Sequence, residues 1–154
     1  MTDRSVTHAT FVIERVYDAP PRLVFAAWAT AEGKASWFVG PEGWSQMERV
    51  FEFRVGGEER LKGAFAGGRT SDFRSRFFDI VPDRRIVYTY DMYIDTTKIS
   101  VSLATVEFLA EGAGTRLVVT EQGAFLDGYD DAGSRERGTG GLLEQLDAAL
   151  RRGA

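Results

Sequence analysis

The feature of this chain that most constrains its fold is a long strand-like stretch, from about Met47 to Gly123, with helical segments on either side. Runs rich in β-branched and aromatic residues alternate there with turn residues such as Gly56-Gly57 and Pro82-Asp83. Short connections of this kind join antiparallel neighbours, because parallel strands need a long crossover. The stretch therefore predicts a largely antiparallel sheet.

Seven strands are expected in total. They lie at about Thr10–Tyr17, Met47–Val55, Glu58–Phe65, Thr70–Val81, Arg85–Tyr93, Lys98–Leu109 and Thr115–Glu121. Alternation within two of them predicts which side chains share a face. Phe73 and Phe77 point one way and Arg74 the other, and Tyr88 and Tyr90 share a face with Met92. The pattern is typical of a sheet covered on one side.

Two short helices are expected between the first two strands. The apolar spacing within Arg22–Trp28 is helical, and Asp18 is a candidate N-terminal cap. A second helix is predicted at Ala31–Phe38, starting at Thr30. Both lie before the long run of strands.

The end of the chain, from about Asp130 or Ser134 to Arg151, predicts an amphipathic helix. Leu142 and Leu146 lead an apolar stripe that we expect to pack on the apolar face of the sheet. Three glycines near the start of this helix, at 138, 140 and 141, each cost about 1 kcal/mol relative to alanine. Either the helix begins after them, or close approach to the sheet or a ligand offsets the cost.

The composition bounds the class of protein. With 154 residues, 44% of them apolar, the chain is expected to form one domain, 1–154, with residues 1–8 as a loose leader. A net charge of −4 gives no reason to expect nucleic acid as a partner. No apolar run suggests a signal peptide or membrane insertion, and there is no cysteine, so a cytoplasmic location is expected.

Several short segments, in this order, carry a family resemblance. They are Arg15-Val16-Tyr17-Asp18-Ala19-Pro20, Val24-Phe25-Ala26-Ala27-Trp28, Trp37-Phe38, Gly40-Pro41, Phe53-Arg54-Val55-Gly56-Gly57, Ile80-Val81-Pro82-Asp83-Arg84-Arg85-Ile86-Val87-Tyr88-Thr89-Tyr90, Gly114-Thr115-Arg116-Leu117-Val118-Val119-Thr120 and Gly141-Leu142 to Leu146-Asp147. Together they resemble the Bet v 1/START-like superfamily, and within it the bacterial branch similar to the C-terminal domain of the Hsp90 ATPase activator.

The resemblance implies an α+β helix-grip fold, in which a curved seven-stranded antiparallel sheet wraps around the C-terminal helix. It also implies an internal cavity, because the superfamily is known mainly for binding hydrophobic small molecules. Some relatives are cyclases, dehydratases or hydrolases. The branch usually carries tryptophan where this chain has Leu142. A leucine there would leave a larger cavity, unless another side chain fills the space.

The candidate ligand-binding residues are mainly aromatic. They are Trp37, Phe38, Trp44, Phe73, Phe77, Tyr88, Tyr90, Leu142 and Leu146. Aromatic rings can bury a ligand, and tyrosine hydroxyls can orient it. The alternative is that these side chains simply form the core.

The sequence offers few catalytic groups and identifies no catalytic residue. The only histidine is His8, so a histidine-based triad or a multi-histidine metal site cannot be built within one chain. Neither a metal nor a cofactor is expected. Acid–base chemistry would have to use a carboxylate such as Glu121 with Tyr88 or Tyr90.

Three functions therefore stay open. The first is binding of a small hydrophobic molecule. The second is a cyclase- or dehydratase-type enzyme, favoured if a phenol and a carboxylate meet inside the cavity. The third is chaperone co-regulation linked to stress response, which rests on the family resemblance alone. The oligomeric state, monomer or homodimer, is equally open.

Overall fold

The computed structural model describes residues 4–153, which form a seven-stranded antiparallel sheet and three helices. The strands are β1 (Val6–Tyr17), β2 (Ser45–Phe51), β3 (Glu58–Ala64), β4 (Thr70–Val81), β5 (Arg85–Ile94), β6 (Thr97–Glu111) and β7 (Gly114–Leu126). The helices are α1 (Pro21–Ala29), α2 (Ala31–Ala35) and α3 (Ala132–Arg151). The strand order is β1-β7-β6-β5-β4-β3-β2.

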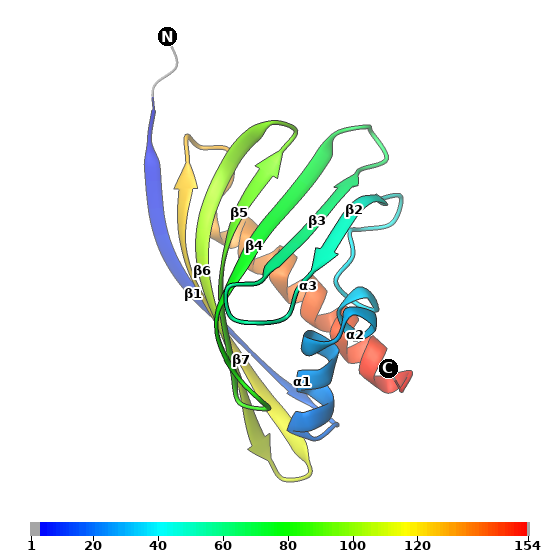
Figure 1. Ribbon diagram of the computed structural model, residues 1–154. Helices are drawn as coiled ribbons and strands as arrows, with labels where there is room; N and C mark the ends of the chain where they lie inside the picture. Colours follow the sequence, from blue (N-terminus) through cyan, green and yellow to red (C-terminus); the bar gives the residue numbers. More distant parts are fainter. Residues whose placement is uncertain (1–3, 154) are drawn as a thin grey trace.

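The sheet curves around α3, which runs along its concave side (Figure 1). Helices α1 and α2 lie between β1 and β2 in the chain and pack near the C-terminal half of α3 (Figure 1). This is the predicted helix-grip α+β fold. No helix within residues 4–153 is long and apolar enough to cross a membrane.

The sheet extends further at β1 and β7 than the sequence predicts. β1 begins at Val6 rather than Thr10, because Val6–Tyr17 pairs throughout with Leu126–Thr115 of β7. His8 therefore lies in a strand and not in a loose leader, while residues 1–3 lie outside the described part. β7 continues past Gly123, where an added Cβ would lie 3.1 Å from the Phe125 ring. Glycine at this position thus reflects packing against Phe125, although it resembles a turn signal.

The first two helices differ in detail from the prediction. The N-cap of α1 is Pro20 rather than Asp18, and Pro21 occupies the first helical position, which proline tolerates. Thr30 caps α2 as expected, since its side chain accepts a hydrogen bond from the Gly33 N–H at 3.0 Å. α2 ends at Ala35, earlier than predicted. Trp37 therefore lies in the segment that follows the helix.

Helix α3 starts before its glycines. Asp131 is its N-cap and accepts a hydrogen bond from the Ser134 N–H at 2.8 Å. Gly138 and Gly141 lie inside the helix, and a Cβ added at either would have no neighbour within 4 Å. Close packing therefore does not require glycine at these two positions.

The C-terminal half of α3 supplies the core. Its buried side chains are Leu143, Leu146 and Ala149, while Leu142 is only half-buried. They pack with aromatic residues of α1 and the concave face of the sheet, including Trp28, Phe77 and Phe108. The opposite, convex face is exposed at Arg74, as predicted. The core therefore fills one end of the fold, beneath the second half of α3.

Candidate functional site

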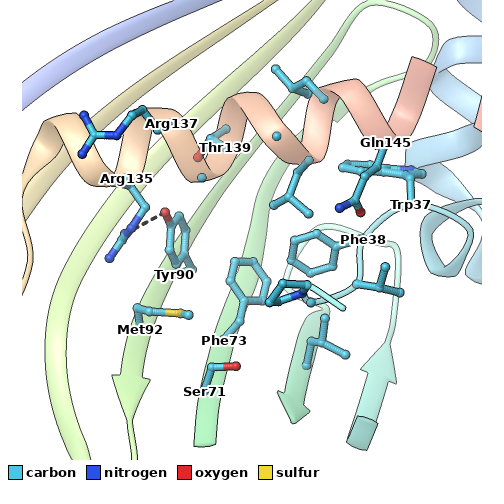
Figure 2. Close-up of a pocket in the computed structure, with 18 of the residues that line it drawn as sticks. Trp37, Phe38, Ser71, Phe73, Tyr90, Met92, Arg135, Arg137, Thr139 and Gln145 are labelled. Atoms are coloured by element: carbon cyan, nitrogen blue, oxygen red, sulfur yellow. Dashed lines mark hydrogen bonds between the residues drawn. The ribbon is translucent and has the colours of Figure 1, made fainter. Parts of the chain in front are cut away.

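A cavity of about 480 Å³ lies between the N-terminal half of α3 and the concave faces of β3, β4 and β5. The segment from Trp37 to Trp44, which joins α2 to β2, forms another wall. Figure 2 shows Phe38 and Phe73 on its inner side and Gln145 entering it from α3. Apolar surface dominates its walls. Such a space, with a few polar groups, is the usual form of a small-molecule site.

Most of the predicted ligand-binding residues lie around this cavity. Trp37, Phe38, Trp44, Phe73, Tyr88, Tyr90 and Leu142 line it. Phe77 and Leu146 instead lie in the core and are not among its lining residues. Leu142 and Leu146 are one helical turn apart on α3. The first faces the cavity and the second lies in the core.

Trp44 is seated in the cavity wall by two glycines. A Cβ added to Gly63 on β3 would lie 2.0 Å from the indole of Trp44, and one added to Gly40 would lie 2.2 Å from it. The indole Nε1–H donates a hydrogen bond to Ser71 Oγ at 3.3 Å. Any larger residue at position 40 or 63 would displace the ring. The sequence therefore shapes this wall through glycine as well as through tryptophan.

A buried polar cluster occupies the end of the cavity near the start of α3. The Tyr90 hydroxyl donates a hydrogen bond to Glu121 Oε2 at 2.8 Å. Arg135 Nη1 donates to the Tyr90 oxygen at 2.9 Å, as Figure 2 shows. Arg135 Nη2 donates to Ser100 Oγ at 2.7 Å and to Asp130 Oδ2 at 2.9 Å. A phenol and a carboxylate therefore meet inside the cavity.

Burial governs the protonation of this cluster. It raises the pKa of Glu121 above its usual range, and hydrogen bonding to Tyr90 and the charge of Arg135 oppose the rise only in part. Burial and the nearby Glu121 charge also raise the pKa of Tyr90. The phenol therefore stays protonated at neutral pH and remains a hydrogen-bond donor. Sequence reasoning identified Tyr90 and Glu121 as a candidate pair but missed Arg135.

A second buried charge pair closes the other end. Lys34 Nζ lies 2.8 Å from Glu59 Oε1, and the two side chains are only 4% and 3% exposed. The ammonium lies within 5.8 Å of four aromatic ring centres, those of Trp28, Trp37, Phe38 and Phe51. Burial lowers the pKa of Lys34, while Glu59 acts in the opposite direction. Across residues 4–153, no three histidine, aspartate or glutamate side chains are grouped so that they could hold a metal ion.

The raised pKa of Glu121 predicts a pH-dependent stability difference for Glu121→Gln. The native pKa exceeds the unfolded value of about 4.3, so the contribution of the protonated carboxyl is present in full below the unfolded pKa. This contribution is lost as the pH rises through the native pKa. Urea unfolding between about pH 4 and 8 should therefore show Glu121→Gln gaining stability relative to the parent as the pH rises. Parallel stability profiles for the two proteins would contradict the assignment.

Residues 18–151 match the family described as activator of Hsp90 ATPase homolog 1-like protein. The chain belongs to this family. The match spans most of the chain, and the helix-grip fold agrees with the Bet v 1/START-like superfamily. Among curated proteins, no sequence matches.

Several solved structures share this fold. An uncharacterised protein from Rhizobium leguminosarum is 45% identical, with a TM-score of 0.93 over 98% of this chain and 99% of that chain. A protein from Rhizobium loti is 48% identical, with a TM-score of 0.87 over 94% of this chain and 99% of that chain. A family relative from Aeromonas hydrophila is 18% identical, with a TM-score of 0.72 over 94% of each chain, and supports the fold alone. The activator-like family thus gives the architecture but names no ligand.

Proposed function

We propose that the protein binds a small, largely apolar molecule in the cavity beneath the N-terminal half of α3. The supporting observation is the cavity itself, about 480 Å³ in volume and walled mainly by aromatic and aliphatic side chains. A well-packed interior leaves few voids larger than a water molecule, so a space of this size is not explained by packing. The polar cluster around Tyr90 would orient the bound molecule.

The neutral fluorophore N-phenyl-1-naphthylamine tests the proposal. Its emission rises in an apolar environment, so titration into the protein should give a saturable increase. Leu142→Trp places an indole on the cavity wall, and we expect the affinity to fall about tenfold because less space remains for the probe. The matched control is Ala148→Trp, which adds the same ring on the exposed side of α3. Absence of saturable binding to the parent, or equal affinity in both variants, would defeat the proposal.

One observation favours acid–base catalysis as a second candidate. Glu121 Oε2 lies 2.8 Å from the Tyr90 hydroxyl, and both residues line the cavity. A carboxylate with a raised pKa is a stronger base, and Arg135 polarises the phenol that would face a carbonyl oxygen. Glu121 would take a proton from the carbon next to the carbonyl. The electron pair of the broken C–H bond would form the enolate. Tyr90, which donates to Glu121 in the structure, would turn its hydroxyl to the enolate oxygen once Glu121 holds the proton.

Proton exchange of a simple ketone tests this second candidate. In D2O the protein should accelerate deuteration of 1-indanone next to its carbonyl, followed by proton NMR. Glu121→Gln should reduce the protein-dependent rate about a hundredfold, since a positioned general base contributes on this order. Glu144→Gln, on the exposed face of α3, is the control. A parent rate equal to that of buffer would exclude this activity for the ketone.

Chaperone co-regulation ranks behind both candidates. It is suggested by the family description, which refers to Hsp90 ATPase activation. Within residues 4–153, no contact or surface adds to it. The direct measurement is the ATPase rate of the host's Hsp90 homologue with and without the protein.

A further inference from the structure

All but one of the charged groups that line the cavity are already paired with an opposite charge. The charged lining groups are Lys34, Glu121, Asp130, Arg135 and Arg137. Lys34 is paired with Glu59 at 2.8 Å, in a site closed off from water. Its ammonium is further stabilised by the surrounding aromatic rings. At this end of the cavity, a charged ligand would have to separate an existing pair.

Arg135, at the other end of the cavity, is also paired with carboxylates. Its Nη2 lies 2.9 Å from Asp130 Oδ2, and its Nη1 lies 3.8 Å from Glu121 Oε2. If Glu121 is ionised, the three groups carry a net negative charge. If Glu121 is protonated, the charges of the three groups sum to zero. In neither state does this cluster offer surplus positive charge to an anion.

Arg137 is the exception, but it does not face the cavity interior. The residue is exposed, and in Figure 2 its side chain leaves α3 on the side opposite that of Arg135. A guanidinium in water contributes little to holding an anion, because solvent and salt screen it. Arg137 therefore does not change the charge balance inside the cavity.

The unmet hydrogen-bonding groups in the cavity wall are neutral. Trp28 Nε1 and Gln145 Oε1 are buried and have no hydrogen-bond partner among the described residues. Both residues line the cavity, but the two atoms have less than 1 Å² of exposed surface, so pairing them with a ligand requires the side chains to turn toward the cavity. A buried polar atom without a partner is costly unless water or a ligand satisfies it. The indole N–H can donate to a hydroxyl or carbonyl oxygen, and the Gln145 amide oxygen can accept from a hydroxyl.

We propose that the cavity selects uncharged molecules that carry a hydroxyl or carbonyl group on an apolar body, and that it rejects carboxylates. This inference rests on the proposed binding function and narrows its ligand class. Binding a carboxylate would desolvate a charge without providing a free cation to compensate it. A neutral alcohol loses far less on leaving water and gains partners in Trp28 and Gln145.

Three naphthalene probes of similar shape and different charge test the selection. They are naphthalene-2-methanol, 2-naphthoate and 2-naphthylmethylammonium, each titrated at pH 7 to displace N-phenyl-1-naphthylamine. The alcohol should bind at least about tenfold more tightly than the carboxylate. Equal or tighter binding of either ion would overturn this inference while leaving the binding function intact. If neither the fluorophore nor any probe binds, the binding function fails and the inference with it.

Asp130→Asn gives a second, independent readout. The change removes the carboxylate that neutralises Arg135, so the affinity for 2-naphthoate relative to the alcohol should rise about fivefold to tenfold. Asp131→Asn is the matched control, since it removes the same charge at the next residue. It also leaves an asparagine, which is a good N-cap for α3. If both variants change the ratio equally, the pairing of Arg135 is not what excludes carboxylates.

Discussion

Replacing Lys34 with methionine is expected to cost about 3–5 kcal/mol of unfolding free energy, because it leaves Glu59 buried without its partner. The carboxylate cannot reach water from a side chain that is 3% exposed. The double variant Lys34→Met/Glu59→Leu should recover most of this loss, since an apolar pair needs no desolvation. Urea denaturation of the parent, of each single variant, Lys34→Met and Glu59→Leu, and of the double variant completes a double-mutant cycle. The cycle gives the coupling energy between the two side chains.

A surface ion pair supplies the control. Lys98 Nζ lies 3.1 Å from Asp91 Oδ2, with both side chains well exposed. Lys98→Met should therefore cost no more than about 1 kcal/mol. If Lys34→Met costs as little as Lys98→Met, the ion pair between Lys34 of α2 and Glu59 of β3 is not closed off from water.

Leu146→Ala is expected to cost about 2–5 kcal/mol, and Leu142→Ala about 1 kcal/mol. Leu146 is fully buried among core side chains, so truncation leaves a new void. Leu142 is half-buried on the wall of an existing cavity, so truncation removes little packing. The same chemical change one helical turn apart thus maps the border between core and cavity. Chemical denaturation measures both, and equal costs would place the two leucines in equivalent surroundings.

Much of the fold could be predicted from local patterns. Turn residues and alternation locate all seven strands, and the apolar stripe locates α3. The errors lie where a tertiary contact overrides a local signal. Gly123 resembles a strand end, yet β7 continues through it because Gly123 pairs with Ala9 of β1 and Ser102 of β6. For α3 the sequence left open whether the helix begins after its glycines, and the Asp131 cap begins it before them, as the predicted start near Asp130 or Ser134 allows.

The cavity was harder to predict than the fold. Tyr88 and Tyr90 could be placed on the inner face from alternation, and Glu121 was a candidate partner. The buried charges could not be recognised in this way. Lys34 is a single lysine in a five-residue helix, and its partner Glu59 is 25 positions away. Arg135 lies among exposed charged residues of α3, and only the folded chain turns it toward Tyr90.

A crystal structure of the protein grown with naphthalene-2-methanol would show directly whether the cavity holds a neutral, largely apolar molecule. We expect electron density for the probe beneath the N-terminal half of α3, against Phe73, Tyr88 and Leu142. The probe hydroxyl should lie within hydrogen-bond distance of Trp28 or Gln145. Side chains that interlock across this space and leave no room for the probe would show that the protein has no such binding site.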